Sequence, residues 1–170
     1  SAPLGREEIY TSLVAGAIGF AIVVVLMIIL YRIMGLAAGI ALTSYIGIVL
    51  VLLNIFEMTL TLPGIAGIVL SIGMAVDANV IIFSRIREEI ATGKTVKSSI
   101  KIGFQKALSA IVDGNVTTLI AAIVLGFKGS GSVKGFAQTL ALGIVVSMFT
   151  ALVVSKLVMN ALYALGLKDV

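Results

Sequence analysis

Five apolar stretches dominate this chain of 170 residues and constrain its fold more than any other feature. They lie at about 12–31, 36–55, 64–83, 107–127 and 136–157. An α-helix needs about 20 predominantly apolar residues to cross the hydrocarbon core of a bilayer, so each stretch is predicted to span a membrane. Charged residues make up only 12% of the chain, about half the share in soluble domains. The sequence therefore predicts an all-α, polytopic helical membrane protein.

Short polar segments separate most of these spans. The first, at residues 32–35, is short enough that the first two helices must be antiparallel neighbours. Pro63 precedes the third span, and proline suits the first turn of a helix because the N–H groups of that turn have no helical partner. Residues 1–10 lack the basic start and the small-residue cleavage site of a signal peptide, so we expect the stalk of something upstream instead. Residues 11–170 are expected to form the transmembrane domain.

The longest polar segment, 84–106, carries six of the basic residues: Arg85, Arg87, Lys94, Lys97, Lys101 and Lys106. Apolar residues recur every four positions at Val96, Ile100, Phe104 and Leu108, which indicates an amphipathic helix. Two interpretations are open. The segment lies on the cytoplasmic membrane surface, or it is a solvated connector whose apolar stripe packs against neighbouring helices.

Basic residues also predict the orientation. If segment 84–106 is inside, nine basic residues lie on the inner side, the six above with Arg32, Lys156 and Lys168. The outer side then keeps three, Arg6, Lys128 and Lys134. The positive-inside rule places the N-terminus outside and the C-terminus in the cytoplasm. Because the basic residues cluster between apolar runs rather than along a soluble face, we expect the lipid bilayer and not nucleic acid as a partner.

Two aspartates interrupt the apolar spans, Asp77 in the third and Asp113 in the fourth. A carboxylate at membrane depth costs at least ~2.5 kcal/mol to insert, so such a group is a functional candidate by default. At about 1.5 Å per residue, both lie roughly 10 Å from the inner ends of their spans. We predict a proton-carrying or gating role for Asp77, with a static interhelical hydrogen bond as the alternative. For Asp113 the two interpretations have equal support.

Other polar residues fall at the same depth as the aspartates, namely Thr43, Ser44 and Thr150. A shared layer is what a buried hydrogen-bonded network or a proton path requires, because each buried polar group must find a partner. We therefore expect a polar layer in the cytoplasmic half of the membrane.

Helix geometry relates each aspartate to its polar neighbours. Asn79 is two residues from Asp77 and about 200° away round the helix, so the two cannot share one partner. Thr117 is one turn from Asp113 on the same face and can hydrogen-bond along it, whereas Asn115 points elsewhere.

Small residues allow close approach of helices, which is the expected role of a stripe on the third span formed by Gly64, Gly67 and Ser71. The same packing role is expected for Gly16 and Gly19 in the first span. Gly73 lies one turn before Asp77, where close packing is again the expected role and room for water is the alternative.

Several kinds of chemistry are excluded by composition. The chain has no cysteine and no histidine, so proton chemistry must use carboxylates. Gly93-Lys94-Thr95 resembles the end of a phosphate-binding loop, but Glu88 stands where the first glycine belongs. We predict a transport component without its own catalytic chemistry, with no cofactor or metal, and with protons as the coupling ion.

Longer motifs carry a family resemblance. Residues 73–89, which read Gly-Met-Ala-Val-Asp-Ala-Asn-Val-Ile-Ile-Phe-Ser-Arg-Ile-Arg-Glu-Glu, resemble the fourth-helix motif of the SecD family of the bacterial Sec protein-export machinery. Residues 113–122 resemble the fifth-helix motif of that family, and residues 135–143 the sixth. The resemblance covers essentially the whole chain. It marks Asp77 and Asp113 as the proton-coupling residues, supported by Asn79, Gly73, Asn115, Thr117, Arg85 and Arg87.

The resemblance also implies an architecture and partners. It implies a bundle of the resistance-nodulation-division type, in which a SecD-like subunit packs pseudo-symmetrically with a SecF-like subunit in the bacterial cytoplasmic membrane. The resemblance also makes residues 1–10 the exit segment from a missing extracytoplasmic domain. Further expected partners are the Sec translocon channel and, through that domain, the translocating polypeptide.

Three functions are compatible with these observations. The leading hypothesis is a membrane domain that uses the proton motive force to promote Sec-dependent protein export. One alternative is a proton-coupled exporter of small molecules or lipids from the same superfamily. The other is a membrane scaffold that transports nothing and whose carboxyl groups only hold helices together.

Overall fold

The structure is a computed structural model that describes residues 2–58 and 61–164. Its elements are α1 (Ala2–Tyr31), α2 (Ile33–Ile55), α3 (Leu62–Ala91), α4 (Val96–Lys128), α5 (Ser132–Phe149), the π-helical turn η1 (Thr150–Val154) and α6 (Ser155–Ala164). The last three follow one another without a break, so five helical units are long and apolar enough to cross a membrane. These described ranges contain no strand, which confirms the all-α prediction. Lys168, which entered the predicted charge bias, lies outside them.

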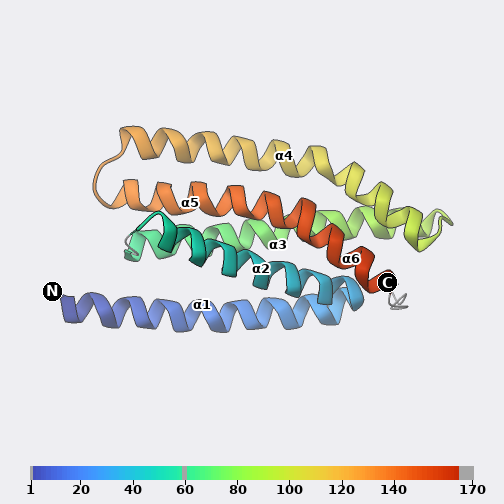
Figure 1. The fold of residues 1–170 in the computed structure, drawn as a ribbon, viewed down its shortest axis with the longest axis horizontal. Coiled ribbons are helices and arrows are strands. Elements are labelled where there is room, and N and C mark those ends of the chain that lie inside the picture. The colour runs from blue at the N-terminus through green and yellow to red at the C-terminus, as the bar shows by residue number, and fades with distance from the viewer. Residues whose placement is uncertain (1, 59–60, 165–170) are drawn as a thin grey trace.

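The helices run side by side and alternate in direction (Figure 1). The α1–α2 connection, the α3–α4 turn and α6 lie at one end of the bundle, and the α2–α3 and α4–α5 connections lie at the other. Helices α1 and α4 occupy opposite edges, whereas α3 contacts α1, α2, α4 and α5. The polar middle of α3 therefore lies at the centre of the arrangement.

Hydroxyl caps fix where α3 and α4 begin. The Thr61 hydroxyl accepts a hydrogen bond from the Gly64 N–H group at 3.1 Å, and Pro63 occupies the first turn as predicted. At the start of α4 the Thr95 hydroxyl accepts from the Ser98 N–H group at 3.2 Å.

The first turn is tighter than the sequence predicted. Only Arg32, with φ of 55°, separates α1 from α2, whereas we expected a turn over residues 32–35. Gly35 makes the tight turn possible, because a Cβ atom there would lie 2.1 Å from the carbonyl oxygen of Met27. Only glycine fits so close to the neighbouring backbone.

Segment 84–106 is not a separate surface helix. It consists of the end of α3, a short turn, and the start of α4. Ile100 and Phe104 are buried against α3, and Lys97 and Lys101 are exposed. The prediction of a helix lying on the membrane surface was therefore wrong, and a connector with a packed apolar stripe is observed. Gly103 explains the packing, since a Cβ atom there would lie 2.9 Å from the Ile86 backbone.

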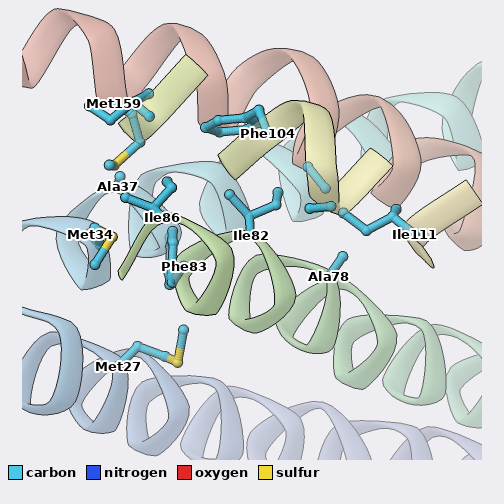
Figure 2. Packing of buried hydrophobic residues seen from close by; sticks show 14 residues of the cluster. Met27, Met34, Ala37, Ala78, Ile82, Phe83, Ile86, Phe104, Ile111 and Met159 are labelled. Atoms are coloured by element: carbon cyan, nitrogen blue, oxygen red, sulfur yellow. The ribbon is translucent and has the colours of Figure 1, made fainter. Parts of the chain in front are cut away.

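The largest apolar core lies toward the end of the bundle that holds the α1–α2 and α3–α4 turns. Side chains from α1, α2, α3, α4 and α6 meet in it, as Figure 2 shows for Met27, Met34, Ile82, Phe83, Ile86, Phe104 and Met159. Most of these residues are almost completely shielded from solvent. Because this core joins all five helical units, the last of them through η1 and α6, it fixes the middle of α3 relative to its neighbours.

Candidate proton-coupling site

Asp77 lies in the middle of α3 and is exposed on the surface of this chain. Its carboxylate makes no hydrogen bond or ion pair with any other residue that the structure describes. The side chain instead lines a groove of about 910 Å³ between α1 and α3. A carboxylate at membrane depth is expected to face protein or water, so a further surface or a water-filled space must cover it in the membrane.

Small residues keep this groove open. Gly73 lies one turn before Asp77, and a Cβ atom on it would meet nothing within 4 Å. The same holds for Gly16 and Gly19 across the groove on α1. The predicted packing role of these two glycines was therefore wrong, because α1 stands away from α3 at this level. The space beside Gly73 likewise contradicts the expected close packing and agrees with the alternative, room for water.

Asp113 lies in the middle of α4 and is also exposed. The Ser109 hydroxyl donates to its carboxylate at 3.4 Å, which is a long hydrogen bond. Thr117 does not reach this carboxylate, because its hydroxyl donates to the Asp113 backbone carbonyl at 2.8 Å. A hydroxyl on a helix commonly bonds the carbonyl one turn earlier, and this preference overrides the predicted contact along the face.

The two aspartates lie at the same level of the bundle. Ile86 and Gly103 mark the register of the antiparallel helices α3 and α4 because their atoms are in close contact. Asp77 is nine residues before Ile86, and Asp113 is ten residues after Gly103. At about 1.5 Å per residue, the two levels agree to within roughly 2 Å. The structure thus places both carboxylates in one layer, although no hydrogen bond connects them.

The asparagines of the two motifs point into the bundle. Asn79 is 2% exposed, which confirms that it faces away from Asp77. Its side-chain amide donates to the Ala75 carbonyl at 2.9 Å, and its oxygen accepts a hydrogen bond from the Ser155 hydroxyl at 2.8 Å. Asn115 is also buried and donates to the Ile111 carbonyl at 2.7 Å, but its side-chain oxygen has no partner among the described residues.

The predicted polar layer does not form a hydrogen-bonded network. The hydroxyls of Thr43, Ser44 and Thr150 each donate to a carbonyl of their own helix, on Gly39, Ile40 and Ser147 respectively. Such local bonds satisfy a hydroxyl without a partner on another helix. A shared depth in the membrane therefore did not predict which polar groups hydrogen-bond to one another.

Arg85 and Arg87 lie well away from the aspartate. They follow Asp77 by eight and ten residues, which is about 12–15 Å along the helix. Arg85 pairs with Glu88 at 3.2 Å. Arg87 donates to the Leu30 carbonyl at 2.7 Å, and its guanidinium carbon lies 4.5 Å from the centre of the Tyr31 ring. Arg87 therefore ties the end of α3 to the end of α1 rather than acting on Asp77.

Three polar contacts were missed by sequence reasoning. The Tyr45 hydroxyl hydrogen-bonds to Ser71, which joins α2 to α3. The Thr139 hydroxyl donates to the Gly64 carbonyl at 2.8 Å, which joins α5 to α3. Ser155, the partner of Asn79, is the third. Each of these residues places a polar group in an apolar span, and that signal was present in the sequence. Which groups pair depends on the register between helices, and a single sequence does not contain that information.

The arrangement defines the class of protein. It is a multi-pass helical membrane domain whose central helix carries a carboxylate that points away from the bundle. A family model described as protein export membrane protein SecD/SecF, C-terminal, matches residues 1–164. The chain belongs to this family.

Similar proteins agree with that assignment. The chain is 52% identical over 159 residues to protein translocase subunit SecD of Acidaminococcus fermentans, covering 94% of this chain and 38% of the relative. It is 54% identical over 155 residues to the SecD subunit of Synechocystis sp., covering 91% of this chain and 33% of the relative. The chain therefore spans well under half the length of these curated relatives.

Solved structures show the same fold. A crystal structure of SecDF, described as a translocon-associated membrane protein, from Thermus thermophilus matches with a TM-score of 0.92 at 38% identity, over 96% of this chain and 23% of that one. A structure of SecDF in a super-membrane-facing form matches with a TM-score of 0.86 at 39% identity, over 96% and 22% of the two chains. The prediction of a SecD-like five-helix membrane domain is confirmed.

Proposed function

We propose that this chain is the membrane domain of a SecD-type subunit that uses the proton motive force to promote protein export, with Asp77 as the group that loads and releases the proton. The relatives named above are translocase subunits, which supports an export role. Protonation of a carboxylate removes its charge, and the cost of a charge at membrane depth changes with it. Such a change is sufficient to bias two arrangements of the helices that surround the carboxylate.

One observation carries the proposal. Asp77 faces the outside of the bundle, beside an open groove, while Asn79 on the same turn is buried. A carboxylate that only held this bundle together would face inward and would have a partner within the chain. Because the Asp77 side chain points away from the bundle, a role toward water or a second subunit is favoured over the scaffold alternative.

The same observation supports a partner of defined chemistry. Asp77 and Asp113 are both exposed at one level, so the surfaces that carry them require polar cover in a membrane. A SecF-like subunit that packs over these surfaces meets the requirement. Contact with the Sec channel and with the exported polypeptide belongs to the full-length protein.

Substitution of Asp77 by asparagine tests the proposal. Asparagine keeps the size and polarity of the side chain but cannot lose a proton, so Asp77→Asn in the full-length protein is expected to abolish stimulation of export by the proton motive force. The measurement is translocation of a secreted precursor into membrane vesicles, with and without an imposed proton gradient.

Thr43→Val is the matched control, because it removes one polar group from a neighbouring span at a similar depth. The Thr43 hydroxyl bonds only its own helix, so stimulation is expected to persist in this variant. Retained stimulation in Asp77→Asn would refute the proton-carrying role. Efflux of a small molecule that depends on Asp77, with export unaffected, would instead favour the exporter alternative.

A further inference from the structure

A single buried hydrogen bond between side chains ties the middle of α3 to the last helical unit. The Ser155 hydroxyl donates to the Asn79 side-chain oxygen at 2.8 Å, and the two residues are 0% and 2% exposed. Neither group can exchange its partner for water without opening the bundle. Because an unpaired buried oxygen is costly, this bond disfavours rotation of α3 about its own axis.

The π-helical turn explains how Ser155 reaches this position. Buried residues recur at every fourth position along the last helical unit, at Thr139, Gly143, Ser147, Ala151, Ser155 and Met159. In a regular α-helix each step of four residues advances by about 40°, so five steps would carry the last residue roughly 200° round the axis. A π-turn takes up one extra residue and recovers about 100° of this drift. Turn η1 lies immediately before Ser155 and so keeps Ser155 on the face that packs against α3.

No other side-chain hydrogen bond among the described residues joins the middle of α3 to another helix. The hydroxyls of Ser147 and Thr150 are buried on the facing helix, but each donates to a carbonyl of its own helix, at 3.0 and 3.2 Å. The nearest other side-chain bonds from α3 to another helix are made by Ser71 and Arg87, eight residues before and eight residues after Asn79 and each about 12 Å along the axis. The bond between Asn79 and Ser155 is therefore the one described side-chain hydrogen bond that joins the middle of α3 to another helix.

We propose that Asn79 is a positioning residue for Asp77. Held by Ser155, Asn79 fixes the rotation of α3 at which Asp77, about 200° away round the helix, faces the outside of the bundle. Turn η1 makes this bond possible because it keeps Ser155 on the face of its helix that packs against α3. The importance of Asp77 itself rests on the proposed function, whereas the rotational role of Asn79 does not.

The absence of cysteine from the chain allows a direct test. Ala78→Cys places a thiol at a site on α3 that is 3% exposed. In the full-length protein in membranes, with its partner subunit, a small membrane-permeant thiol reagent reacts there only when α3 turns or opens, so the reaction rate reports that population. Adding Ser155→Ala is expected to raise the rate about threefold, the factor that corresponds to an average interhelical hydrogen bond in a membrane protein.

Ser147→Ala is the matched control. It removes the same atom from a residue that is 1% exposed and belongs to the same series, but the lost bond is internal to its helix. The rate at Ala78→Cys is expected to stay unchanged. A second reporter, Ala122→Cys on α4, is 1% exposed and is expected to be insensitive to Ser155→Ala. Equal effects of the two serine variants, or equal increases at both reporters, would show general loosening and overturn the proposal.

Two further results separate this inference from the proposed function. Asn79→Ala is expected to raise the rate as Ser155→Ala does, and the double variant no further, because both remove the same bond. Additive increases would overturn the proposal. In the export assay, Ser155→Ala is expected to weaken stimulation while Ser147→Ala does not. If Asp77→Asn keeps full stimulation, the proposed function fails, yet the thiol rates still decide whether Asn79 sets the rotation of α3.

Discussion

At the scale of single residues, the direction of a side chain separates function from structure in this protein. Asp77 and Asn79 are two residues apart, and one is exposed while the other is 2% exposed. Both are polar residues in an apolar span, and composition does not distinguish them. Their directions do, because the buried one must be paired inside the chain and the exposed one is available to water or a partner.

Glu89 is a second residue whose environment matters. It lies in the last turn of α3, beyond the apolar run, and its side chain is only 3% exposed. Hydrogen bonds from Lys106 and Lys94, with the charges of both lysines, lower the pKa of Glu89 below its ordinary value of 4.5. A lowered pKa means that the ionised carboxylate stabilises the folded α3–α4 turn at every pH above about 4.5. This contribution is lost as the pH falls through the pKa of the folded state.

Glu89→Gln is therefore expected to loosen the α3–α4 turn at neutral pH. The lysines lose a charged partner, so amide hydrogen exchange over residues 90–96 is expected to accelerate relative to the unsubstituted protein. The difference is expected to shrink only as the pH falls from 4.5 through the lowered pKa of folded Glu89, because the carboxylate becomes protonated over that range.

Glu88→Gln provides the control for this prediction. Glu88 is 60% exposed in its side chain and pairs with Arg85 on the surface, where ion pairs contribute little. Exchange over the turn is expected to be unchanged. Equal exchange in Glu88→Gln and Glu89→Gln would contradict the role assigned to the buried carboxylate.

At the scale of helices, small residues have two opposite uses. In the N-terminal half of α3, Gly67 lies against α5, and a Cβ atom there would be 2.7 Å from the Phe136 carbonyl oxygen. Gly143 on α5 is equally crowded by Ser71 and Tyr45. In the groove beside α1, by contrast, Gly73 faces open space. The stripe on α3 packs as predicted, while the glycines next to Asp77 leave a gap.

Gly67→Ala is expected to destabilise the bundle. The added methyl group meets backbone atoms that cannot move aside, and overpacking of this kind typically costs about 1–3 kcal/mol. The effect is measured as a lower midpoint of thermal unfolding in mild detergent.

Gly47→Ala on α2 is the control, since a Cβ atom there meets nothing within 4 Å. Alanine is favoured over glycine in a helix by up to about 1 kcal/mol, so this variant is expected to be neutral or slightly more stable. A Gly67→Ala protein as stable as Gly47→Ala would show that α3 and α5 are not held in the close contact described.

At the scale of the whole molecule, the alternating helices sort the connections between two ends (Figure 1). Arg32, segment 84–106 and Lys156 belong to one end, and Lys128 and Lys134 to the other. This sorting is what the predicted orientation requires, with the end richer in basic residues in the cytoplasm. The orientation itself stays a prediction.

Single cysteines test that orientation. Ser130→Cys lies in the α4–α5 connection and Ala91→Cys at the end of α3, and both sites are exposed. In intact bacteria a membrane-impermeant maleimide is expected to label Ser130→Cys, and to label Ala91→Cys only after the cells are permeabilised. The reverse pattern would invert the topology, and the 170 residues of this chain contribute no other cysteine to the labelling.

The sequence by itself determined the helices, their number and their order. Apolar runs of about 20 residues admit few structures other than membrane-spanning helices, because the bilayer requires every backbone polar group to be bonded within its segment. The motif around Asp77 also identified the family before any contact was known. These properties are local, so a chain read one segment at a time reveals them.

Only the tertiary structure decided which polar groups meet. Thr43 and Thr150 share a depth with Asp77 but bond their own helices, whereas Asn79 and Ser155, 76 residues apart, form a pair. Pairing depends on the register and rotation of one helix against another. The glycines at close crossings and the π-turn before Ser155 set these quantities, and their effect exists only when two helices are in contact. For that reason the sequence located Asp77, and the fold established which way it faces.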